Sequence, residues 1–232
     1  MDFIFMLTRA DETVANGLQL LDGLAGLGLR HIGFKDVGAD RATLRALSER
    51  IAAIGATSYL EVVSPGADSC LAAARTAAEI GVDRLLGGTE VDSTLEILRG
   101  TDTEYFPFPG FPAGHPTDLR GSGVHIAEHC TAFMAKGCAG ADLLAYRATE
   151  ADPLDLVRSA RKALGTGLLI VAGGICSKAQ LADLGRAGVD AFTVGTAIFD
   201  NAFAAGEPGI ANQIRAIQTA LEGNIELMPG TT

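Results

Sequence analysis

The stretch GLLIVAGGICSKAQLADLGRAGVDAFTVGTAIFD, residues 167–200, decides the fold class of this chain. Its two short apolar runs, 168–172 and 191–194, are rich in β-forming residues, and each leads into a glycine turn, which is typical of buried strands. Between them, Ser177 and Gly188 stand where a helix would begin and end. The stretch therefore predicts a strand, a helix and a second strand parallel to the first.

The same alternation of short apolar runs and longer Ala- and Leu-rich amphipathic runs extends along the whole chain. Its repeat of roughly 22 to 28 residues is about the length of one strand, one helix and two short loops. Asp40 and Asp152 precede helical runs as N-caps. Eight strands are predicted, at residues 3–7, 31–35, 58–63, 84–86, 105–108, 142–146, 168–172 and 191–194.

Eight units of near-equal length predict a closed (β/α)8 barrel, or TIM barrel, which forms one domain over residues 1–232. An open doubly wound sheet alternates strands and helices in the same way. The first turn between strand and helix, TRAD at residues 8–11, lacks the G-x-G-x-x-G that a dinucleotide-binding sheet would carry there. The closed barrel is therefore the favoured architecture.

Only the fifth unit is longer, because FPGFPAGHPTDLRGSG, residues 108–123, follows its strand. In a barrel this position is a ligand-facing loop, so the segment is either a functional lid or an irregular surface loop. His115 lies in it, and a mobile loop could bring this side chain over a substrate as an acid or base.

The amino-acid composition and net charge limit the kinds of partner that this chain is expected to bind. Hydrophobic residues make up 48% and charged residues 20% of the chain, which is ordinary for a globular protein. The net charge of -10 disfavours nucleic acid. The start MDFIFMLTRADET does not resemble a secretory signal, no apolar run is long enough to span a membrane, and the four cysteines form no C-x-x-C pair. We expect a cytoplasmic protein without a membrane or nucleic-acid partner.

Two glycine turns, at Gly173-Gly174 and at Gly195-Thr196, follow the seventh and eighth strands. Glycines let backbone N–H groups approach the oxygens of a phosphate, and the phosphate sites of TIM barrels frequently lie at these two loops. The alternative is that the glycines only permit tight turns. Their presence at corresponding positions of consecutive units favours phosphate binding.

With these turns, VAGGICSKAQLADLGRAGVDAFTVGTAIF, residues 171–199, resembles the last two units of the ribulose-phosphate-binding barrel superfamily. That superfamily includes phosphosugar isomerases, epimerases and lyases. The resemblance implies a phosphate-binding role for Gly173, Gly174, Gly195 and Thr196. Several members carry D-x-K-x-x-D on strand 3, whereas this chain carries GFKDVG on strand 2, so the resemblance does not identify the reaction.

Strand alternation indicates which polar side chains face the barrel interior. Ile32 and Phe34 form the apolar face of the second strand, which leaves Lys35 facing inward at the catalytic end, and Glu61 faces inward on the third strand. Neighbouring strands would place Lys35 beside Glu61. Such a pair is either a structural ion pair or catalytic, and its position at the mouth of the barrel favours catalysis.

Three further residues lie at the ends of strands on the same side of the barrel: Arg9, Tyr146 and Arg147. They are candidates for binding substrate oxygens or a carboxylate, and ordinary salt bridges at the loop entries are the alternative. His125 and His129 match the H-x-x-E-H spelling of a zinc site, but they fall on an outer helix and no third ligand is suggested, so no metal site is predicted. Cys176 is interpreted as structural.

Three functions are compatible with this pattern. In a cofactor-independent phosphosugar isomerase or epimerase, Glu61 would abstract a proton beside a carbonyl and Lys35 would stabilise the enediolate. In an aldolase or lyase, Lys35 would form a Schiff base. A non-catalytic sensor of a phosphorylated metabolite is the third. We expect no organic cofactor, and a homodimer is the default expectation for the assembly.

Overall fold

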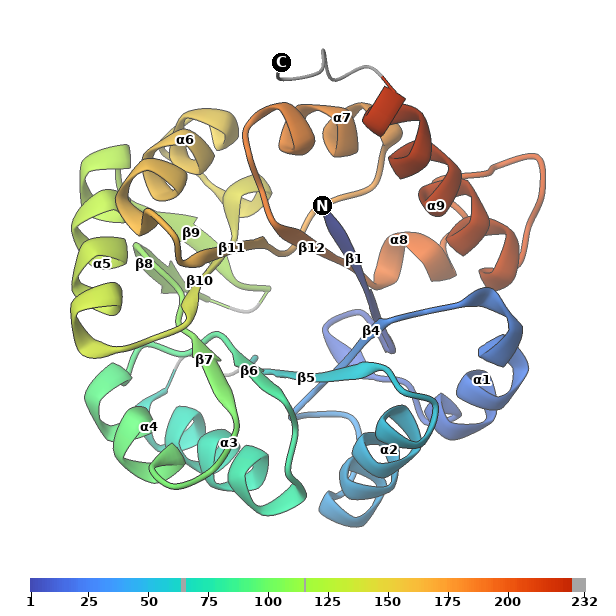
Figure 1. The fold of residues 1–232 in the computed structure, drawn as a ribbon, viewed down its shortest axis with the longest axis horizontal. Coiled ribbons are helices and arrows are strands. Elements are labelled where there is room, and N and C mark those ends of the chain that lie inside the picture. Colours follow the sequence, from blue (N-terminus) through green and yellow to red (C-terminus); the bar gives the residue numbers. More distant parts are fainter. Residues whose placement is uncertain (64–65, 115, 227–232) are drawn as a thin grey trace.

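Eight parallel strands form a nearly closed barrel at the centre of the structure (Figure 1). The computed structural model describes residues 1–63, 66–114 and 116–226. Hydrogen bonds from Ala139 N to Tyr105 O (3.0 Å) and from Asp142 N to Pro107 O (3.1 Å) close the seam between the first and last strands of the sheet. In sheet order, the strands are β10 (Gly140–Leu143), β11 (Leu168–Val171), β12 (Ala191–Val194), β1 (Asp2–Met6), β4 (His31–Lys35), β5 (Thr57–Glu61), β6 (Arg84–Leu86) and β7 (Glu104–Phe106).

All eight predicted strands are confirmed, and so is the TIM-barrel fold. The prediction at residues 142–146 was wrong about where that strand ends. The chain leaves β10 after Leu143 and forms a 3-10 turn at Ala145–Arg147, in which Arg147 N donates to Leu144 O. Tyr146 and Arg147 are thereby carried off the strand and onto the loop above it.

Helices form a ring outside the strands (Figure 1). Asp40 and Asp152 cap their helices as predicted, since each side chain accepts hydrogen bonds from N–H groups of the first turn. Ser177 forms a reciprocal capping box with Gln180. The helices are α1 (Gly17–Leu24), α2 (Arg41–Ala53), α3 (Ala67–Ile80), α4 (Val91–Leu98), α5 (Gly123–Lys136), α6 (Pro153–Leu164), α7 (Lys178–Arg186), the short α8 (Thr196–Phe199) and α9 (Ile210–Glu226).

The apolar side chains form two clusters on opposite faces of the strands. Ile32 and Phe34 belong to the large cluster between strands and helices, and Tyr59 belongs to the small cluster inside the barrel, which confirms the predicted alternation. The inner cluster consists of Ile4, Met6, Tyr59, Leu86, Phe106, Ile170 and Ala191. None of these side chains is charged, so a charged side chain inside the barrel lies next to an apolar cluster.

Two hairpins project from the carboxyl end of the barrel. In the first, β2 (Thr8–Arg9) and β3 (Glu12–Thr13) pair around Ala10 and Asp11, whose φ angles are 51° and 62°. Positive φ at both central residues is typical of a two-residue hairpin turn, here without the usual glycine. The Thr13 hydroxyl accepts from Lys35 N and donates to Lys35 O, both at 2.8 Å, which fastens the hairpin to β4.

The long fifth-unit segment contains the second hairpin, formed by β8 (Phe111–Ala113) and β9 (Asp118–Arg120). Thr149 N donates to Leu119 O at 3.0 Å, which attaches this hairpin to the loop between β10 and α6. His115 lies outside the described residues. Within the described residues, no helix combines the length and apolar character required to cross a bilayer.

Candidate active site

A cavity of about 340 Å³ lies at the carboxyl ends of the strands. One side of it carries four ionisable groups, and the other side is formed by the two glycine turns. The ionisable residues are Asp11, Lys35, Glu61 and Arg147, and the turn residues are Gly173, Gly174, Gly195 and Thr196. The structure therefore brings both sets of residues to one cavity.

Lys35 is the centre of the charged side. Its Nζ donates to Asp11 Oδ1 at 2.7 Å and lies 3.5 Å from Glu61 Oε1, and its side chain is only 7% exposed. Lys35 and Glu61 are direct register partners on β4 and β5. Burial by itself would lower the pKa of Lys35, but the carboxylates of Glu61 and Asp11 outweigh burial and raise it above the usual value. Lys35 is therefore held as an ammonium group.

Asp11 joins Lys35 to Arg147. Arg147 donates to both carboxylate oxygens of Asp11, at 2.9 and 3.2 Å, in a bidentate pair. Burial opposes ionisation of Asp11, yet the hydrogen bonds and charges of Arg147 and Lys35 hold the Asp11 pKa well below its usual range. Asp11 was not predicted as a site residue, because TRADET lacks the glycine that signals a tight hairpin.

Asp142 is the second site residue that the sequence analysis missed. It is completely buried, and neither carboxylate oxygen has a hydrogen-bond partner among the described residues. Burial and the nearby Glu61 raise the Asp142 pKa well above its usual value, more than Lys35 and Arg147 lower it. Burial therefore favours the neutral form of the Asp142 carboxyl. The alternation rule that selected Lys35 would have found it, because Ala141 and Leu143 face the helices.

We expect Asp142→Asn to stabilise the protein at neutral pH. The unfolded chain loses the Asp142 proton near pH 4, whereas the folded protein retains it, so stability falls as pH rises above 4 until the raised folded pKa is passed. The Asn side chain does not ionise, so the variant avoids this loss of stability as pH rises. Urea unfolding from pH 4 to pH 8 should show that the advantage of the variant grows by up to about 1.4 kcal/mol for each pH unit. An Asn variant that is the less stable protein at pH 8 would mean that Asp142 is ionised.

The first glycine turn packs directly against the charged side of the cavity. Gly173 and Gly174 both have φ of 73°. A Cβ on Gly173 would lie 2.4 Å from Arg147 Nε, and one on Gly174 would lie 3.0 Å from Tyr146 Cβ. Both glycines are thus required by conformation and by close packing, whatever they bind.

The second turn is equally tight, since a Cβ on Gly195 would lie 2.4 Å from Thr8 Oγ1. Thr196 Oγ1 accepts from Ala10 N at 3.1 Å, which ties this turn to the first hairpin. Among the described residues, the N–H groups of Gly173, Gly174, Thr196 and Ala197 donate to no protein acceptor. The glycine side of the cavity therefore offers unused backbone donors from both turns.

Gly173→Ala should destabilise the protein by about 1–3 kcal/mol, because the new methyl group meets Arg147 and the residue is held at positive φ. Gly185→Ala is the matched control. Gly185 lies in α7 with no atom within 4 Å of an added Cβ, so this substitution should stabilise by up to about 1 kcal/mol. Thermal unfolding measures both, and equal stability of the Gly173 variant and the wild type would contradict the packing described above.

Other predicted residues lie away from the cavity wall. Arg9 pairs with Asp200 at 2.9 Å, and its side chain is 60% exposed. Asp200 lines the cavity, so Arg9 is linked to the site by its ion pair with Asp200. Tyr146 packs against the outer apolar cluster behind Gly174, and its buried hydroxyl has no hydrogen-bond partner among the described residues. Of the three predicted substrate-binding residues, Arg147 alone lines the cavity.

The two histidines of α5 have local partners. His129 Nδ1 accepts from Gly110 N at 3.0 Å, and His125 Nδ1 accepts from Ser122 N at 3.2 Å. The described residues contain no cluster of His, Cys, Asp and Glu side chains suited to a metal ion. The interpretation of Cys176 as a buried structural thiol was wrong, because Cys176 is exposed and lines the cavity. Its N–H donates to Gln180 Oε1.

No protein-family model and no curated protein matches the chain in sequence. Solved structures match its fold. Orotidine 5'-monophosphate decarboxylase from Sulfolobus solfataricus is 11% identical, with a TM-score of 0.64 over 97% of this chain and 100% of that one. A mutant of mandelate oxidase with a monooxide FMN adduct is 14% identical, with a TM-score of 0.67 over 97% of this chain and 74% of that one.

A third match is the BexX/CysO complex from Amycolatopsis orientalis, which is 18% identical, with a TM-score of 0.62 over 100% of this chain and 94% of that chain. Sequence identities this low carry no information on the reaction, because one fold hosts many chemistries. The chain thus shares the TIM-barrel fold with these proteins, and its function has to be inferred from its own cavity.

Proposed function

We propose that this protein is an enzyme that isomerises or epimerises a small phosphorylated sugar or related metabolite through an enediolate. One observation carries the proposal: the buried Lys35 ammonium group lies between two carboxylates in a cavity that is also lined by glycine turns. Among the described residues, N–H groups of these turns have no protein acceptor. Such a cavity suits a substrate with a phosphate at one end and a carbonyl at the other.

The glycine side is the proposed phosphate end. Gly173, Gly174 and Thr196 line it, and among the described residues their N–H groups have no protein acceptor. Backbone donors from converging turns bind phosphate well. Asp200 also lines this end, and its pairing with Arg9 offsets a charge that would repel the phosphate. A phosphorylated substrate also agrees with the resemblance to the ribulose-phosphate-binding barrels and with orotidine 5'-monophosphate decarboxylase among the fold matches.

The charged side is the proposed reaction end. Glu61 is the base that removes the proton beside the carbonyl, and Lys35 donates to the oxygen that becomes the enediolate oxygen. Proton return to the former carbonyl carbon gives the isomer, with the hydroxyl proton of the deprotonated carbon passing to the enediolate oxygen. Protonation of the deprotonated carbon from its opposite face by water gives the epimer. The raised pKa of Asp142 matters here, because an ionised carboxylate beside Glu61 would oppose the enediolate charge.

The Schiff-base lyase is the second candidate. It requires a neutral Lys35 amine as nucleophile, whereas Asp11 and Glu61 together raise the Lys35 pKa and favour the ammonium form. The environment of Lys35 therefore favours acid–base chemistry. Borohydride treatment with candidate keto-phosphates separates the two, because only an imine leaves a reduced adduct on Lys35.

Ligand-induced thermal stabilisation across a panel of sugar phosphates and their unphosphorylated sugars tests the proposal. We expect stabilisation by at least one phosphorylated ketose or aldose, loss of that stabilisation without the phosphate group, and a weaker effect in Gly173→Ala. Equal stabilisation by the unphosphorylated sugars would contradict the phosphate site. A phosphate-dependent ligand that is bound without ever being converted would support the non-catalytic sensor instead.

A further inference from the structure

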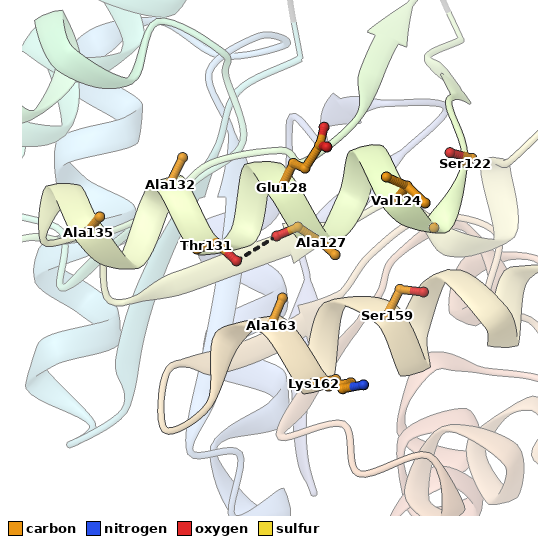
Figure 2. Close-up of a pocket in the computed structure, with 11 residues that line it drawn as sticks. Ser122, Val124, Ala127, Glu128, Thr131, Ala132, Ala135, Ser159, Lys162 and Ala163 are labelled. Atoms are coloured by element: carbon orange, nitrogen blue, oxygen red, sulfur yellow. Dashed lines mark hydrogen bonds between the residues drawn. The ribbon is translucent and has the colours of Figure 1, made fainter.

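A second and larger cavity, an open groove of about 950 Å³, lies on the outside of the barrel between α5 and α6 (Figure 2). Small and apolar side chains line most of it, among them Val124, Ala127, Ala132 and Ala135 of α5. Val124 is 65% exposed, which makes it the most exposed large hydrophobic residue among those described. The groove shares no lining residue with the cavity at the barrel mouth.

The solvent-facing side of α5 lacks the charges that an outer helix normally carries. On α2, Arg41, Arg45 and Glu49 are exposed. Along α5, the exposed positions that line the groove are apolar or uncharged, with Glu128 as the exception. Helices that face water are usually polar on that face, so this surface is better suited to contact with protein than with water.

The apolar surface continues beyond the groove. Phe111, at the start of β8, is 48% exposed and packs edge-on against the rings of His125 and His129 of α5, with ring centroids 5.2 and 5.5 Å apart. Two of the most exposed large hydrophobic residues, Phe111 and Val124, are thus associated with one helix. A partner that covers the groove can therefore also reach the surface beside it.

The two charged residues that line the groove have opposite signs and lie on opposite banks. Glu128 projects from α5 and Lys162 from α6, at similar positions along the two helices (Figure 2). Neither has an ion-pair partner among the described residues, whereas the neighbouring Lys136 pairs with Asp92 and Arg158 pairs with Asp155. Each bank thus presents one unused charge.

We propose that the face formed by α5 and α6 binds a second copy of this chain, related by a two-fold axis parallel to the helices. Such an axis places α5 of each protomer opposite α6 of its partner. Glu128 of one copy then meets Lys162 of the other, twice per dimer, and the Ala-rich grooves cover each other. The face formed by α5 and α6 is self-complementary in charge, and this property favours a second copy of the chain over an unrelated protein.

The test is the oligomeric state of the full chain, measured by analytical ultracentrifugation over roughly a hundredfold range of concentration. We expect a wild-type dimer and a monomer for Ala132→Arg, which places a large charged side chain in the groove. Glu128→Lys and Lys162→Glu should each raise the dimer Kd by at least roughly tenfold, because like charges then face each other. The double variant should restore the dimer, which a folding defect would not do.

The matched control substitutions lie on α2. Ala52→Arg and Glu49→Lys make the same changes at exposed positions of another outer helix and should leave the dimer intact. A monomeric wild type overturns the proposal, including the case in which the groove binds a different protein. A dimer that resists Ala132→Arg, or one that the double charge reversal fails to restore, also overturns it. None of these results depends on the catalytic proposal.

Discussion

Glu61→Gln is expected to lower kcat by about 10²- to 10⁴-fold while the ligand still raises the Tm. Glutamine keeps the size and polarity of the side chain but cannot accept the substrate proton. Glu61 ends β5 beside Lys35 and is almost fully buried, so water cannot easily replace it as base. Steady-state kinetics on the keto-phosphate identified by thermal stabilisation measures the first effect, and the thermal shift itself measures the second.

The control for this substitution is Glu12→Gln. Glu12 lies on the first hairpin at an exposed position, so its replacement should change kcat by less than about twofold. A Glu61→Gln enzyme with kcat within a few-fold of wild type would mean that another group is the base, and would remove Glu61 from the mechanism.

Lys35→Met is expected to lower kcat by about 10²- to 10³-fold, because the developing enediolate loses its cationic partner. The same change should cost about 3 kcal/mol of stability, since it leaves Glu61 buried without its ion pair while Arg147 continues to hold Asp11. Urea unfolding and kinetics measure the two effects separately. A Lys35→Met enzyme with unchanged kcat would exclude the proposed role.

The pH dependence provides a check on the charge state of Lys35. Its folded pKa is raised above the ordinary value of 10.5, so the stability that its ion pairs contribute is fully present at neutral pH. That contribution disappears only when pH rises beyond the raised pKa. Wild-type stability relative to Lys35→Met should therefore be constant from pH 6 to pH 9. A relative loss of wild-type stability within that window would indicate an unprotonated lysine, as the Schiff-base mechanism requires.

The fold could be predicted from the sequence because the residues that begin and end helices stand where a (β/α)8 barrel requires them. Glycines end several of the helices shortly before the following strand begins, and Asp40 and Asp152 cap the helices that they precede. The neighbouring positions of Lys35 and Glu61 also followed from the sequence, because alternation chose the inward residues and chain order made β4 and β5 adjacent. Both inferences need only the two-residue alternation of side chains along a strand and the adjacency of consecutive strands in the barrel.

The rest of the site depends on contacts that no local pattern encodes. Asp11 reaches Lys35 only because Ala10 and Asp11 adopt positive φ in a hairpin that Thr13 fastens to β4. The pairing of Arg147 with Asp11 joins positions 136 residues apart. Tyr146 was selected by its place at the end of a predicted strand, and the 3-10 turn at Ala145–Arg147 instead leaves it packed against the outer cluster.

The most direct measurement is solvent deuterium incorporation into the keto-phosphate that stabilises the protein most. If Glu61 removes a proton beside the carbonyl, proton NMR in D₂O should show deuterium entering at that carbon with the wild-type enzyme. The Glu61→Gln enzyme should exchange it at least about 10²-fold more slowly, with the ligand still bound. Conversion of the ligand without deuterium at either that carbon or the former carbonyl carbon would contradict the enediolate mechanism.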